Sequence, residues 1–164
     1  MYRIFFSHSG KDAEWAILIQ KELKEMKYSS VYLFEDNPQV VGMTIDEEVR
    51  AKVKENDLTL VFLSENSQEP RSLRWITKEI AWSEGMRKPL VFIVDKETPR
   101  EVIDLLCGKK YINFDKANGV TQEFQDTLKK SLHAALGQKR MVTIIELVIV
   151  AIGFGLHAII NRKE

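Results

Sequence analysis

The chain has 164 residues, a length that suits one domain of ordinary size with a small appendage. Hydrophobic residues make up 45% of it and charged residues 29%, which is typical of a packed globular core and excludes a globally disordered chain. Lysine plus arginine equal aspartate plus glutamate at 24 each, so the net charge gives no attraction to nucleic acid, and none is expected as a partner. The single cysteine excludes an intramolecular disulfide and a cysteine-rich metal site.

Short apolar runs alternate along the chain with longer amphipathic segments. Taken in chain order, the predicted strands are RIFFS (3–7), VYLF (31–34), LTLVFLS (58–64), LVFIV (90–94) and KYINF (110–114). Helices are predicted over residues 13–26, 45–55, a segment that ends near residue 86, a short segment after Pro99, and 121–136. This alternation predicts an α/β fold, with a parallel sheet between two layers of helices and the run 58–64 at its centre.

Two of the predicted helices begin at a capping residue. Asp12 precedes the first helix and is expected to cap it. Thr44 precedes the second and is followed three residues later by Glu47, which is the pattern of a capping box.

The last part of the chain is strongly apolar. Residues 141–160 would form a helix about 30 Å long, close to one hydrocarbon thickness, and basic residues flank the segment. We therefore predict a basic linker over 137–140, a transmembrane helix over 141–160 and a tail over 161–164. The alternative is a hydrophobic helix that packs on the domain or on a partner, and Glu146 within the segment favours that alternative.

Several kinds of site are disfavoured by the motifs present. Neither a P-loop nor the glycine pattern of a dinucleotide-binding Rossmann domain occurs. The three histidines lack ligand spacing, so no metal site is expected. His8 follows the first strand, where it would either contact a ligand or bond to the backbone. Ligands of parallel sheets bind at the carboxyl ends of the strands, so the loop SHSGKD (7–12) is a candidate binding segment.

Two further stretches have both a functional and an ordinary interpretation. Glu35 and Asp36 directly follow the second predicted strand and begin a polar loop that reaches Gly42, either beside the cleft or as a solvated connection. Trp75 and Glu79 lie four residues apart and share one face of a helix. Either the two residues take part together in the chemistry of a site, or Trp75 is a core aromatic residue and Glu79 a solvated acid.

Taken together, RIFFSHSGKD, VYLFEDNPQVVG, LTLVFLSENS and RWITKEIAWSEGMRKPLVFIV resemble a TIR (Toll/interleukin-1 receptor) domain of the prokaryotic type, over residues 1–136. The resemblance implies a flavodoxin-like three-layer fold with a five-stranded parallel sheet. It also implies an NAD+ glycohydrolase or cyclase that cleaves the nicotinamide–ribose bond, with NAD+ as substrate and no cofactor.

The resemblance also implies roles for individual residues. Glu79, in the W-x-x-x-E element, is the expected catalytic residue, and Trp75 the expected wall of the pocket. His8, Ser9, Lys11, Glu35, Asp36 and Gly42 are the other expected substrate-binding residues. Unlike many members, the chain has no basic residue directly after the first strand, so phosphate contacts would fall to Lys11, Arg71, backbone amides or a neighbouring subunit.

TIR domains typically act after homotypic self-association. The resemblance therefore implies an oligomer or filament and a role in anti-phage defence. The predicted helix 141–160 would tether this assembly to a membrane, with the domain in the cytoplasm. Two other functions stay open: a non-enzymatic signalling scaffold, and an effector that disrupts membranes when its TIR domains cluster.

Overall fold

The computed structural model describes residues 2–28, 30–32 and 44–137 of the chain. Five strands form one sheet with the order β2-β1-β3-β4-β5, and every neighbouring pair is parallel. The strands are β1 (Arg3–Ser7), β2 (Ser30–Tyr32), β3 (Leu58–Leu63), β4 (Leu90–Asp95) and β5 (Ile112–Phe114). The predicted parallel α/β architecture is therefore confirmed.

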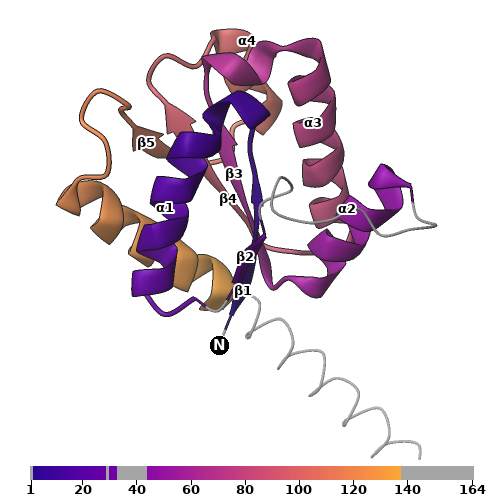
Figure 1. Cartoon of the computed structure of the whole chain (residues 1–164), viewed down its shortest axis with the longest axis horizontal. Helices are drawn as coiled ribbons and strands as arrows, with labels where there is room; N and C mark the ends of the chain where they lie inside the picture. The colour runs from indigo at the N-terminus through magenta and orange to yellow at the C-terminus, as the bar shows by residue number, and fades with distance from the viewer. Residues whose placement is uncertain (1, 29, 33–43, 138–164) are drawn as a thin grey trace, which may run out of the picture.

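Helices connect the strands and cover both faces of the sheet. They are α1 (Ala13–Glu25), α2 (Ile45–Glu55), α3 (Pro70–Gly85), α4 (Arg100–Ile103) and a helix over residues 122–137. Short 3-10 turns occupy η1 (Gly10–Asp12), η3 (Glu65–Gln68) and η4 (Asp104–Leu106). Figure 1 shows α1 and the helix over 122–137 on one side of the sheet, with α2 and α3 on the other.

Strand β3 lies at the centre of the sheet, and both its faces are buried and largely apolar. All six of its residues are buried. Leu58, Leu60 and Phe62 join the core under α1 and the helix over 122–137, whereas Val61 and Leu63 join the core under α3 and α4. Alternate side chains of a strand point to opposite faces, so a continuous apolar run requires cover on both sides.

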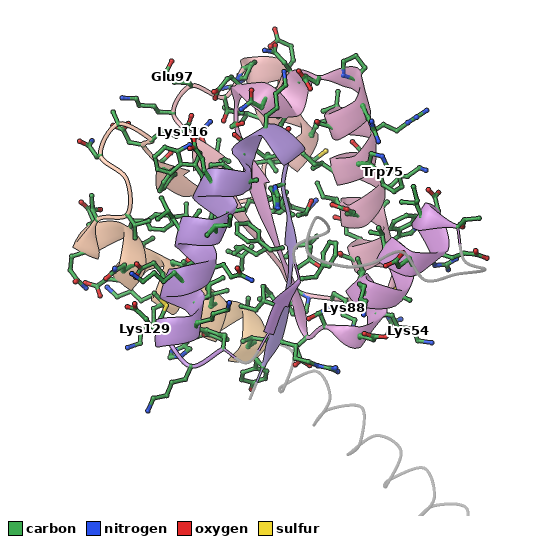
Figure 2. The ribbon with its side chains drawn as sticks, viewed as in Figure 1. Lys54, Trp75, Lys88, Glu97, Lys116 and Lys129 are labelled. Carbon is green, nitrogen blue, oxygen red and sulfur yellow. The ribbon has the colours of Figure 1, made fainter. Side chains whose placement is uncertain are left out.

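Helix α2 begins at the predicted capping box. The Glu47 backbone N–H donates to Thr44 Oγ1 at 3.3 Å, and the Thr44 N–H donates to the Glu47 carboxylate at 2.9 Å. At the other end, the Lys88 ammonium donates to the carbonyl oxygens of Lys54 and Asn56, so it satisfies acceptors that the helix leaves open. Figure 2 labels Lys54 and Lys88, which come together at this end of α2.

Replacing Thr44 with alanine is expected to lower the free energy of unfolding by about 1 kcal/mol, because the first turn of α2 loses its side-chain acceptor. Urea denaturation measures the change. Thr77→Ala is the matched control, since the Thr77 hydroxyl donates to the Leu73 carbonyl within its own exposed helix turn. An equal loss of stability in the two variants would contradict the capping role of Thr44.

Asp12 does not cap α1 as predicted. It occupies the N-cap position, but its side chain makes no capping hydrogen bond. The carboxylate is fully buried and accepts instead from Ser64 Oγ at 2.6 Å and from Lys116 Nζ at 3.0 Å. Partners from the ends of other strands therefore replace the local cap.

The predicted membrane localisation is corrected by the structure. Over residues 2–28, 30–32 and 44–137, no helix has both the length and the apolar character needed to cross a membrane. The predicted hydrophobic helix over 141–160, on which that localisation depended, lies outside the described residues. The tail 161–164 and all but the first residue of the linker 137–140 also lie outside them.

Candidate active site

A cavity of about 420 Å³ lies where β1 ends, between the loop that follows β1 and the helices α2 and α3. This volume is in the range of small-molecule sites, roughly 300–1,000 Å³. The cavity is lined by Phe5, Phe6, Ser7, His8, Ser9, Gly10, Lys11, Ile45, Val49, Glu69, Arg71, Ser72, Trp75 and Glu79.

Glu79 is the buried carboxylate of this cavity. Its side chain is 7% exposed, and one carboxylate oxygen accepts a hydrogen bond from Ser7 Oγ. Burial raises the pKa of Glu79 to about 7, and the bond from Ser7 acts in the opposite direction. Near neutral pH the group therefore exists both as a carboxylate and as a carboxylic acid.

The contact between Ser7 and Glu79 follows from how β1 and α3 are placed. Ser7 is the last residue of β1, and it pairs with Val61 of the central strand. Pro70 occupies the first turn of α3, where a missing N–H is tolerated, and the helix then buries Ile76 and Ile80 against the sheet. The same helix brings Glu79 next to the end of β1.

Trp75 forms a half-buried wall of the cavity. It packs against the apolar cluster of Phe5, Val49 and Val53. The Lys78 ammonium lies 4.8 Å from the centre of the indole ring, and it also pairs with Asp46 at 2.7 Å. These contacts fix the indole on α3, where Figure 2 labels it, and leave part of it on the cavity surface.

The loop after β1 forms the second polar wall. The His8 ring donates from Nδ1 to the Ser9 carbonyl at 2.8 Å, and the hydroxyls of Ser9 and Ser72 lie 3.1 Å apart. Lys11 forms an ion pair with Glu69 at the rim, and this hydrogen bond raises the pKa of Lys11. Both partners are exposed, so the pair is a weak one that a bound anion can displace.

A buried polar network beneath this loop holds it in place. Asp12 closes the loop, with its N–H bonded to the Ser9 carbonyl. Its carboxylate also accepts from Asn66 Nδ2 at 2.8 Å, and Lys116 bridges it to Glu65 at 3.1 Å. Lys116, labelled in Figure 2, thus connects the segment after β5 to the turns that follow β1 and β3.

The mouth of the cavity combines positive charge with apolar surface. Lys11 and Arg71 bring cationic side chains to it, and Ile45 and Val49 supply apolar contact from α2. Cations of this kind suit the phosphates of a nucleotide. Among residues 2–28, 30–32 and 44–137, no group of three or more His, Cys, Asp or Glu side chains is arranged to hold a metal ion.

A family profile described as "TIR domain" matches residues 4–140. The chain belongs to the TIR domain family. No curated protein sequence matches it at a significant level.

Solved structures show the same fold at low sequence identity. The TIR domains of the activated Roq1 resistosome, which directly recognises the pathogen effector XopQ, match with a TM-score of 0.60 and 14% identity over 80% of this chain and 99% of theirs. The CMP N-glycosidase BcmB of Clostridium botulinum matches with a TM-score of 0.50 and 16% identity over 77% of this chain and 98% of its own. At these identities the likeness establishes the fold alone.

Five of the site residues predicted from the sequence line this same cavity: Glu79, Trp75, His8, Ser9 and Lys11. The other three, Glu35, Asp36 and Gly42, lie outside the described residues.

The prediction did not include Ser7 among the site residues, although this serine contacts Glu79 directly. Its position at the end of a buried strand, facing the predicted cleft, is the signal that could have found it. The apolar residues Ile45 and Val49 were also missed, because on sequence alone they are ordinary core positions of an amphipathic helix.

Proposed function

We propose that this TIR domain cleaves the N-glycosidic bond between nicotinamide and ribose in NAD+, with Glu79 as the catalytic residue. The observation that carries the proposal is the Glu79 carboxylate, buried in a nucleotide-sized cavity beside Trp75. Membership of the TIR family supports the choice of NAD+.

The chemistry suits the groups present. When the bond between C1′ of the ribose and the pyridinium nitrogen breaks, its electron pair goes to that nitrogen and nicotinamide leaves as a neutral molecule. No acid is needed for this departure. Positive charge develops on the ribose ring, and the Glu79 carboxylate stabilises it electrostatically. Capture by water gives ADP-ribose, whereas capture by a nitrogen of the adenine gives a cyclic product.

Burial of the carboxylate strengthens this effect. In a cavity of low dielectric constant, a negative charge stabilises a nearby developing cation more strongly than it would in water. The positive pyridinium ring of bound NAD+ also favours the ionised form of Glu79, which lowers its pKa in the complex relative to the free protein.

A second candidate is the hydrolysis of a nucleotide with a neutral base, as named for BcmB. It is favoured by the pKa of Glu79, about 7, because the protonated fraction at neutral pH could protonate a departing base. The two candidates differ in the state of Glu79 that they require.

The test is an assay of purified protein with NAD+ and with CMP, at several protein concentrations because self-association is expected of a TIR domain. Release of nicotinamide with ADP-ribose or its cyclic form is the expected result, with a specific activity that rises with protein concentration. Release of cytosine from CMP without loss of NAD+ would favour the second candidate.

Replacing Trp75 with alanine is expected to raise the KM for NAD+ about tenfold, because a stacking surface worth about 1.4 kcal/mol is lost. Trp75→Phe keeps an aromatic ring and should show a smaller rise. Trp82→Phe is the matched control, since Trp82 packs on the same apolar cluster but does not line the cavity. A KM that is unchanged in Trp75→Ala would remove the indole from substrate binding.

A further inference from the structure

Ser7 and Glu79 form a hydrogen-bonded pair inside the cavity. The Ser7 side chain is 2% exposed, and its hydroxyl donates to one oxygen of the Glu79 carboxylate. The two residues are 72 positions apart, and the contact joins the end of β1 to the middle of α3.

The second oxygen of Glu79 is left for the cavity. Among the described residues, the side-chain oxygens that are both buried and unbonded are Tyr28 Oη and Asp95 Oδ2. One Glu79 carboxylate oxygen accepts from Ser7. The other carboxylate oxygen is not among these buried and unbonded atoms, so it has access to the cavity that Glu79 lines.

We propose that Ser7 is the positioning residue of this site: its buried hydroxyl holds one oxygen of Glu79 and keeps the other directed into the cavity as a carboxylate. The proposal rests on the proposed function, since it assigns Ser7 a part in the same reaction. Ser7 acts through Glu79, because its hydroxyl is already engaged with that group.

The rigidity of Ser7 makes it suited to this role. Its backbone pairs with the central strand β3, and only one rotatable bond, Cα–Cβ, sets the position of the hydroxyl oxygen. A donor fixed in this way favours the ionised carboxylate over the neutral acid and restricts its rotamer.

The effect of Ser7 on Glu79 can be distinguished by experiment from the effects of the other ionisable groups around the cavity. The cavity-lining segments supply His8, Lys11, Glu69 and Arg71, and α2 contributes the apolar Ile45 and Val49. On α3 itself, Lys78 is held by Asp46 and by the Trp75 ring. His8 lines the same cavity as Glu79 and therefore has its own control variant.

The first experiment does not depend on catalysis. The side-chain carboxyl carbon of Glu79 is followed by NMR in glutamate-labelled protein and identified by its loss in Glu79→Gln. In Ser7→Ala the titration midpoint is expected to rise by about one unit, because a hydrogen bond to the charged form is lost. Ser9→Ala, a buried serine of the same cavity that contacts Ser72 instead, should leave the midpoint in place.

The second experiment is kinetic. With the midpoint raised by one unit from about 7, the ionised fraction at pH 7 falls from about a half to about a tenth, so kcat/KM in Ser7→Ala falls about fivefold. Because bound NAD+ lowers the pKa of Glu79 in the complex, kcat at saturating NAD+ is expected to fall less than kcat/KM. Ser7→Thr keeps the hydroxyl and should retain the wild-type pH profile, and so should His8→Gln.

The possible outcomes separate the two claims. A Glu79 midpoint that is the same in Ser7→Ala and wild type overturns the role of Ser7, and so does an acidic limb that moves with His8→Gln and not with Ser7→Ala. If the midpoint is raised in Ser7→Ala but the wild-type protein never releases nicotinamide, the positioning of Glu79 by Ser7 stands and the proposed function alone is overturned.

Discussion

Replacing Glu79 with glutamine is expected to lower nicotinamide release from NAD+ by at least about a thousandfold, or about 4 kcal/mol of transition-state stabilisation. Glutamine has nearly the same shape and its amide oxygen can still accept from Ser7, so the cavity should persist. What disappears is the negative charge that faces the ribose. Steady-state assays at saturating NAD+ measure the change.

The control for this variant is Glu84→Gln. Glu84 belongs to the same helix, but its side chain is 48% exposed, pairs with Lys109 at 2.8 Å and does not line the cavity. It should keep the wild-type activity. A scaffold without enzymatic activity would show no NAD+ loss in any of these proteins, and its signalling would survive in Glu79→Gln.

The same substitution is expected to stabilise the fold above pH 7. The pKa of Glu79 is about 7 in the folded protein and close to 4.5 when the chain is unfolded. Between these values the folded state binds the extra proton, so the free energy of unfolding falls as pH rises through the folded pKa, by up to about 3 kcal/mol in total, and levels off about one pH unit above it. The neutral glutamine does not have this loss.

Urea denaturation of wild type and Glu79→Gln at pH 5 and pH 8 tests this prediction. The two proteins should be close in stability at pH 5, and Glu79→Gln should be the more stable at pH 8. Taking the difference between them removes the titration of all other groups. In Glu84→Gln the difference from wild type should not change with pH. A Glu79→Gln protein that is less stable than wild type at pH 8 would show that burial of the carboxylate is not unfavourable.

Together the two results would show that the Glu79 carboxylate is needed for catalysis and lowers the free energy of unfolding. A buried carboxylate with one hydrogen bond is unfavourable for folding and useful in stabilising a cation. Selection for stability alone would replace Glu79 by a neutral residue.

The sheet was predictable because its signals are local. The continuous apolar run 58–63 requires cover on both faces, which places β3 at the centre, and the Thr44–Glu47 capping box is visible within four residues. The spacing of Trp75 and Glu79 also predicted a shared helix face, and both residues line the cavity.

The remaining features depend on contacts between segments far apart in the chain. Asp12 was predicted as a cap, but Lys116, 104 residues away, provides a partner for its carboxylate. Lys11 was expected to contact phosphate, and in the structure it pairs with Glu69 across 58 residues. No local pattern identifies such partners, because they are set by how the ends of the strands come together.

The most direct test of the central claim is the pH dependence of nicotinamide release from NAD+. If the Glu79 carboxylate is the catalytic group, kcat/KM rises with pH through a midpoint near the Glu79 pKa of about 7 and is constant above it, and Glu79→Gln releases no nicotinamide at any pH. A rate that falls with pH over this range, or equal release by Glu79→Gln, would contradict the account.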